Sequence, residues 1–124
     1  IVNYLSRPRN NSMPPANRPE SASSPDQRAN RAAAVRLLKA MANEHRLGIL
    51  CALRGGEVSV SELCNMLPLS QSAMSQHLAW LRNEQLVTSR REAQSMFYRL
   101  GDQRAADVIA LLNRLYGPVS SEDQ

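Results

Sequence analysis

The sequence predicts a mainly α-helical domain that carries one small β-hairpin. Two observations support this fold class. Apolar residues recur at helical spacing in four stretches between residues 27 and 83, and again over 103–116. Residues 86–91 and 95–100 instead alternate apolar and polar side chains, as paired strands do, across a short connection at 92–94. Helix, helix, helix, turn, helix, hairpin, helix is the element order of a winged helix-turn-helix domain, which we expect to be dimeric.

The first two predicted helices meet at Asn43. The first, expected over 27–42, places Val35 and Leu38 on one side. Asn43 is a favourable N-cap because its side chain can accept hydrogen bonds from the first free backbone N–H groups of the second helix. That helix is expected to end at Gly55, since glycine commonly terminates helices.

A tight turn at 67–69 joins the third and fourth predicted helices. Ser59 and Glu62 have the spacing of a capping box at the start of the third helix, and Pro68 closes it. Ser70 is the N-cap expected for the fourth helix, over 71–83. In a helix-turn-helix unit the second helix lies in the major groove of DNA, so 71–83 is the predicted recognition helix.

The start of this recognition helix carries short polar side chains. Glutamine can pair bidentately with adenine, and serine can bond to several bases. An ordinary solvated helix face is the alternative, but such faces usually hold acids and lysines, and residues 70–81 contain neither. The predicted DNA-contacting residues of this helix are Ser70, Gln71, Ser72, Ser75, Gln76, His77 and Arg82, with Gln71, Ser72, Ser75 and Gln76 reading bases.

The hairpin supplies a second expected DNA contact. Arg90 and Arg91 stand near its tip, where a wing can place arginine on phosphates or in the minor groove, and Gln94 completes the set. A plain two-stranded ribbon with solvated arginines is the alternative. The net charge of +4 comes from 14 Arg and one Lys against 11 acids, which fits a nucleic-acid partner without requiring one.

Composition divides the chain into three parts. Residues 1–28 hold five of the seven prolines with many Asn, Ser and Arg, and are expected to be a disordered basic tail. This tail is interpreted as a solvated leader, although its arginines leave contact with DNA phosphates open. Residues 29–118 form the expected DNA-binding and dimerisation domain, and 119–124 a short C-terminal tail.

The last predicted helix has an apolar band too wide for a single contact with the core. We therefore expect its excess apolar surface to pack against the first helix and their symmetry mates in a homodimer. The predicted interface residues are Val35, Leu38, Val108, Ile109, Leu112, Leu115 and Tyr116.

Residues 40–100 resemble the ArsR/SmtB family of winged-helix repressors. The matching stretches lie at 41–47, 49–51, 61–63, 69–78, 81–82, 86–87 and 90–94. Within the family, the chain looks most similar to the branch that holds sulfide- and oxidation-responsive regulators and a nodulation repressor. The resemblance implies a homodimer joined through its first and last helices and bound to an inverted-repeat operator.

The resemblance also indicates how such a protein could be switched. One metal site of the family uses paired cysteines in the third helix, where this chain has only Cys64. Another uses Asp and His on the last helix, where Asp102 is followed by Arg104, and no histidine comes after His77. We therefore expect no metal and no cofactor.

Cys51 matches the helix-two cysteine of the redox-responsive branch, but the last helix lacks the partner thiol. Both Cys51 and Cys64 lie on apolar helix faces, where cysteine usually acts as an inert small hydrophobe. Core packing is the favoured interpretation. A thiol- or sulfide-responsive repressor using Cys51, with Cys64 as a second candidate thiol, is the alternative.

Other classes of protein fit less well. No Gly-rich phosphate loop or paired carboxylates appear, so we expect no enzyme. A protein-interaction module would usually lack the basic residues Arg82, Arg90 and Arg91. No apolar stretch approaches the ~20 residues of a membrane span, and two cysteines suit a reducing cytosol. The expected location is the bacterial cytoplasm, at the nucleoid.

Overall fold

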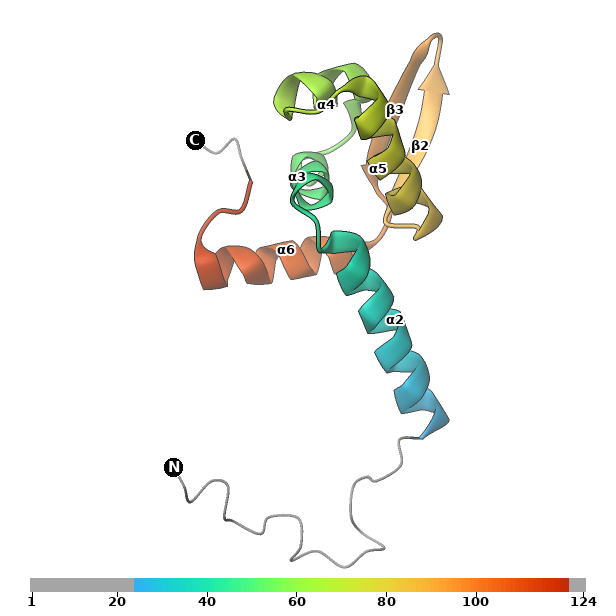
Figure 1. Cartoon of the computed structure of the whole chain (residues 1–124), viewed down its shortest axis with the longest axis vertical. Helices are drawn as coiled ribbons and strands as arrows, with labels where there is room; N and C mark the ends of the chain where they lie inside the picture. Colours follow the sequence, from blue (N-terminus) through green and yellow to red (C-terminus); the bar gives the residue numbers. More distant parts are fainter. Residues whose placement is uncertain (1–23, 121–124) are drawn as a thin grey trace, which may run out of the picture. The chain divides into compact units, whose positions relative to one another are not determined.

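The structure, a computed structural model, describes residues 24–120 (Figure 1). Residues 34–120 belong to one compact unit, and residues 24–33 belong to another. The elements are α2 (Pro25–Met41), α3 (Glu44–Leu53), β1 (Val58–Ser59), α4 (Val60–Met66), α5 (Gln71–Asn83), β2 (Val87–Glu92), β3 (Ser95–Leu100) and α6 (Gln103–Tyr116).

The helix-turn-helix unit consists of α4 and α5, and the residues predicted to cap these helices do so. The Ser59 hydroxyl accepts the Glu62 backbone N–H at 3.1 Å, while the Glu62 carboxylate accepts the Ser59 N–H, which completes the expected capping box. The Ser70 hydroxyl accepts the Ala73 N–H at 3.1 Å at the start of α5. The predicted winged helix-turn-helix architecture is therefore confirmed, with α5 at the predicted bounds.

The hairpin of β2 and β3 belongs to a three-stranded antiparallel sheet with strand order β1-β3-β2. The β2–β3 hairpin matches the prediction, except that β2 extends to Glu92 and the connection shortens to Ala93-Gln94. Strand β1 was not predicted, because two residues show no alternation. It forms through pairing with a distant segment, Val58 opposite Tyr98 and Ser59 opposite Phe97.

The core gathers around α3, which packs against α4, α5 and α6 (Figure 1). Ile49 and Leu50 of α3 are fully buried, as are Leu63 of α4 and Met74 of α5. A single small core thus holds both helices of the helix-turn-helix unit against α3, which stabilises their mutual orientation through apolar burial.

Helix α2 begins at Pro25, so residues 25–28, which the sequence analysis assigned to the tail, are helical. The reason is a second capping box: the Ser24 hydroxyl accepts the Gln27 N–H, and the Gln27 side chain accepts the Ser24 N–H, both at 3.0 Å. Proline at the first helical position has a backbone angle already suited to a helix. The other tail residues, 1–23 and 121–124, lie outside the described residues.

Between residues 24 and 120, no helix combines the length and apolar character that a membrane crossing requires.

Candidate nucleic-acid interface

Helix α5 buries one side and exposes the side predicted to read DNA. Met74, Leu78 and Leu81 are buried against the core. The predicted base-reading residues are all exposed: Gln71, Ser72, Ser75 and Gln76. Ser70 is also exposed, but its hydroxyl is already engaged as the N-cap, and Arg82 is exposed in the last turn. The burial of every third or fourth residue therefore leaves a continuous polar face at the start of the helix.

A hollow of about 210 Å³ separates α5 from the hairpin. It brings together three predicted site residues that are distant in sequence: Gln71 and Ser75 of α5, and Gln94 of the hairpin connection. Ser59 and Ser61 at the start of α4, and Ser95 of β3, also line it. The sequence analysis missed these serines as site residues, because only tertiary structure places them beside α5.

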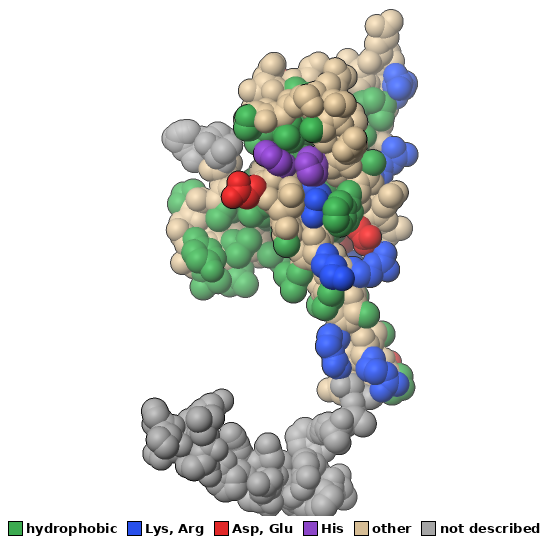
Figure 2. Space-filling model, viewed as in Figure 1, with side chains coloured by type: hydrophobic (Ala, Val, Ile, Leu, Met, Phe, Trp, Pro, Cys, Tyr) green, Lys and Arg blue, Asp and Glu red, His purple; other side chains and the backbone are tan. Residues whose placement is uncertain are grey.

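His77 differs from the other predicted contacts because it is half-buried. Its ring lies 5.6 Å from the ring of His45 on α3, and the two histidines are side by side on the face in view in Figure 2. Burial, together with the nearby Arg46 and His45, holds the pKa of His77 below its usual value, so its neutral form is favoured. His77 thus lies at the contact between α3 and α5.

Arg46 is a buried charged residue for which the sequence predicted no role. Its Nε donates to the Ala40 carbonyl at 2.6 Å and its Nη2 to the Lys39 carbonyl at 3.0 Å, which satisfies two carbonyls at the end of α2. Its guanidinium lies 3.6 Å from the centre of the Trp80 ring on α5. Burial lowers the pKa of Arg46, but an arginine stays charged at neutral pH. One side chain therefore contacts α2, α3 and the recognition helix.

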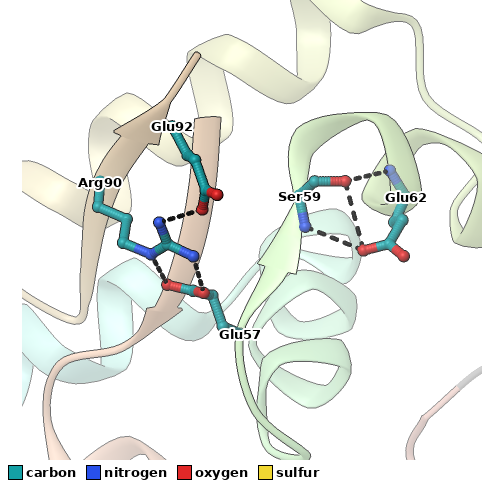
Figure 3. A network of polar contacts seen from close by, with 5 residues as sticks. All are labelled: Glu57, Ser59, Glu62, Arg90 and Glu92. Carbon is teal, nitrogen blue, oxygen red and sulfur yellow. Dashed lines mark hydrogen bonds and ion pairs between the residues drawn. The ribbon is translucent and has the colours of Figure 1, made fainter. Parts of the chain in front are cut away.

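Arg90, on strand β2 of the wing, is held by two carboxylates, as Figure 3 shows. Its Nε and Nη2 each donate to a Glu57 carboxylate oxygen at 2.8 Å, and its Nη1 donates to Glu92 at 2.7 Å. The hydrogen bond from Arg90 lowers the pKa of Glu57 below its ordinary value. Arg91, the next residue, is exposed, and so is Gln94.

An apolar face is left open on α2 and α6. Four predicted interface residues are substantially exposed: Val35, Leu38, Leu115 and Tyr116. Val108 and Leu112 are half-buried, whereas Ile109 is fully buried in the core and has no surface to offer a partner. Leu111, outside the predicted set, is 42% exposed instead. Figure 2 shows hydrophobic side chains gathered over α6 on the face in view.

The two cysteines lie in different surroundings. Cys51 is 9% exposed among core residues of α3, as its apolar spacing predicted. Cys64 is half-buried on α4 and packs at the edge of the same core. Among residues 24–120, no three His, Cys, Asp or Glu side chains are grouped as a metal site would require.

Comparison with known proteins agrees with this geometry. The family model for bacterial regulatory proteins of the arsR family matches residues 43–89, which run from the cap of α3 into β2. The transcriptional activator HlyU of Vibrio cholerae is 60% identical over 87 residues, which cover 70% of this chain and 81% of that protein.

Two solved structures show the same architecture. The transcriptional repressor BigR from Xylella fastidiosa is 34% identical with a TM-score of 0.68, over 76% of this chain and 97% of that one. The homodimeric winged helix-turn-helix DNA-binding domain from Mycobacterium bovis, solved by NMR, is 29% identical with a TM-score of 0.66, over 77% and 89%. The similarity to HlyU and BigR confirms the branch of the family that the sequence resemblance indicated.

Proposed function

This chain belongs to the ArsR family of bacterial transcriptional regulators, and we propose that it is a homodimeric repressor that binds an inverted-repeat operator. HlyU is named as an activator and BigR as a repressor, so both directions of regulation occur among its relatives. Repression is the direct effect proposed, because a dimer that occupies an operator excludes other proteins from the same DNA without a further contact.

The observation that carries this proposal is the exposed amide and hydroxyl face at the start of α5. Gln71, Ser72, Ser75 and Gln76 stand within two turns of each other on the second helix of a helix-turn-helix unit. Their donors and acceptors suit base edges in the major groove. The N-terminus of α5, with no acid in its first turn, also favours a nearby phosphate.

The wing supplies contacts of a second kind. Arg91 and Gln94 are exposed near its tip, and Gln94 lines the hollow that borders α5. We assign both to the DNA backbone or minor groove. Arg90 is left out of this set because two carboxylates already bind its guanidinium.

Dimerisation follows from the apolar surface of α2 and α6. Leu115 is 63% and Tyr116 79% exposed, and Leu38 of α2 is 56% exposed. Large apolar side chains exposed in such numbers often mark an interface. The M. bovis relative is described as homodimeric, which supports the same arrangement here. A two-fold dimer would place two α5 helices in half-sites separated by about one turn of DNA, roughly 34–36 Å.

The readout is tested on an operator selected by the wild-type protein from random duplexes. Replacing Gln71 or Gln76 by alanine should cost ~1–3 kcal/mol and relax preference at one base position. Gln103→Ala on α6 is the matched control and should leave both affinity and preference unchanged. Unaltered base preference in Gln71→Ala and Gln76→Ala would refute the assignment of α5.

The dimer is tested by light scattering at micromolar concentration. Leu115→Glu should shift the wild-type dimer mass toward that of a monomer, because it places a charge in the apolar face. Met66→Glu is the matched control, since Met66 is 43% exposed on α4, outside that face. A monomeric wild-type protein would refute the proposal.

We also propose that neither a metal nor a thiol is needed for DNA binding, and that the chain acts in the cytoplasm without catalysing a reaction. The burial of Cys51 supports DNA binding that needs no thiol, because a reactive thiolate needs exposure. A gel shift should survive EDTA and mild peroxide. Loss in EDTA restored by zinc, or a tenfold loss on oxidation that Cys51→Ser abolishes, would contradict it.

A further inference from the structure

Arg90 and Arg91 are neighbours in sequence but lie on opposite faces of the wing. Successive side chains of a strand point to opposite faces, so Arg91 shares a face with Val87 and Ser89, and Arg90 with Thr88 and Glu92. The first face is the better covered one, because Val87 is buried and Ser89 half-buried, whereas Thr88 and Glu92 are exposed.

The face that carries Arg91 is the one turned toward the recognition helix. Arg91 pairs with Met96, and Ser89 pairs with Tyr98. Met96 and Tyr98 line the hollow beside α5 together with Leu78 of that helix. Arg91 therefore extends from the same side of the sheet as the hollow, and Arg90 from the reverse side.

On the reverse side, Arg90 spans the sheet from one edge strand to the other. Its cross-strand partner is Phe97 on β3, whose ring centre lies 4.7 Å from the guanidinium. Beyond Phe97 is β1, and Glu57 directly precedes it. The bidentate pair with Glu57 thus connects β2 to the segment that leads into β1, across the central strand (Figure 3).

Carboxylates already take three of the five N–H donors of the Arg90 guanidinium, which leaves fewer for a phosphate. Each of its three nitrogens donates to a carboxylate oxygen at 2.7–2.8 Å, and its central carbon lies 4.7 Å from the centre of the Phe97 ring. Bidentate pairing of this type is geometrically specific, which suits the group for fixing a position. A DNA phosphate that approached Arg90 would also approach the carboxylates of Glu57 and Glu92.

We propose that Arg90 is a positioning residue that clamps the wing to the start of the helix-turn-helix unit through Glu57, while Arg91 makes the DNA-backbone contact. The contact assigned to Arg91 rests on the proposed function, whereas the clamp concerns the protein alone. The clamp also affects α4, because Ser59 is both the last residue of β1 and the N-cap of α4. Holding Glu57 therefore fixes the hairpin relative to the helix that precedes the recognition helix.

The clamp is tested first without DNA, by amide hydrogen exchange across β2 and β3 of the full chain. Arg90→Ala and Glu57→Gln should both accelerate exchange in the hairpin, and the double variant should exchange no faster than either single one. Arg91→Ala is the matched control and should leave exchange unchanged. Unchanged exchange in Arg90→Ala and Glu57→Gln would overturn the clamp, whatever the result with DNA.

The division of roles is tested by the salt dependence of binding to a duplex selected by the wild-type protein. Arg91→Ala should lower the slope of log K against log salt by about one for each subunit bound. Arg90→Ala and Arg90→Lys should each weaken binding about fivefold with the slope unchanged, since lysine keeps the charge but loses the bidentate pair. Glu57→Gln should weaken binding equally, although it removes a negative charge near DNA.

Two results would overturn the role assigned to Arg90: a slope lowered by about one per subunit in Arg90→Ala, or tighter binding in Glu57→Gln. The second would mean that Glu57 withholds Arg90 from DNA. A wild-type protein that bound no duplex would refute the proposed function and the role of Arg91, while hydrogen exchange would still decide the clamp.

Discussion

Two arginines connect distant elements of this chain, and they do so in opposite surroundings. Arg46 is 5% exposed, donates to neutral backbone carbonyls at the end of α2 and lies against the Trp80 ring. The Arg90 side chain is 49% exposed and is bound by two carboxylates. Each side chain joins three segments, but the first lies in the interior and the second at the surface of the wing.

This difference in burial predicts that one arginine stabilises the fold and the other positions the wing. Exposed ion pairs contribute little to the free energy of unfolding, because water solvates the separated charges well. A buried charged donor contributes much more, because its removal takes two hydrogen bonds from carbonyls at the end of α2, and the Lys39 carbonyl keeps only a long one, from the Ala42 N–H at 3.4 Å. We therefore expect Arg46 to stabilise the fold and Arg90 to determine where the wing lies without contributing much to stability.

The largest effect is expected for Arg46→Ala. It should lower the free energy of unfolding by about 3 kcal/mol, because it removes two charge-assisted hydrogen bonds and leaves a cavity beside Trp80. Urea denaturation monitored by circular dichroism measures this loss. Arg90→Ala is the comparison and should leave the denaturation midpoint nearly unchanged. Equal losses of free energy of unfolding in Arg46→Ala and Arg90→Ala would contradict the different roles assigned to these two arginines.

A smaller effect is expected for Trp80→Ala, which removes the aromatic surface against Arg46 but keeps its hydrogen bonds. The free energy of unfolding should fall by about 1–2 kcal/mol, the range of a partly desolvated cation–π contact. Trp80→Phe keeps an aromatic face and should recover much of the loss in the same denaturation experiment. A phenylalanine variant as unstable as the alanine variant would show that the ring face contributes nothing.

The next effect concerns pH and His77, which lies beside Arg46. Because burial and the Arg46 charge lower the pKa of His77 in the folded chain, the unfolded chain binds more protons below about pH 6.5. The free energy of unfolding should therefore fall as pH decreases from about 6.5 toward the lower folded-state pKa. Denaturation at several pH values measures this slope, and His77→Gln should flatten it. A slope of unchanged size in the variant would exclude His77 as its source.

The smallest effect is expected for Glu92→Gln. Glu92 accepts one hydrogen bond from Arg90 and its side chain is 65% exposed, whereas Glu57 accepts two and is 29% exposed. Amide exchange in β2 and β3 should therefore change less in Glu92→Gln than in Glu57→Gln. The reverse order would place the main anchor of Arg90 within its own strand.

Much of the fold could be predicted because its signals are local. Asn43, Ser59 and Ser70 all cap the helices that they were expected to cap, since a capping residue bonds to groups only two or three positions away. The polar face of α5 follows from the same local helical geometry. The capping box at Ser24 was equally local, but the surrounding prolines and polar residues favoured a tail instead.

The parts that sequence could not predict depend on contacts between distant segments. In the sequence, Arg46 looks like an ordinary polar residue in the first turn of a helix. Only the packing of α2 and α5 around it buries its side chain. Glu57 becomes the partner of Arg90 through the pairing of β1 with β3. Ile109 has the same apolar character as its helical neighbours, and only the position of α3 decides that it belongs to the core.

One residue, Ser59, serves both a strand and a helix, and this limits how the hairpin could be exchanged between related proteins. Ser59 is the last residue of β1 and the N-cap of α4, and Glu57, two residues earlier, binds Arg90. A hairpin grafted from a relative over 87–100 would lack its carboxylate acceptor unless the relative's own segment corresponding to 57–59 were transferred with it. The functional module for such a chimera is therefore discontinuous in the gene, consisting of a hairpin and a three-residue segment some thirty positions upstream.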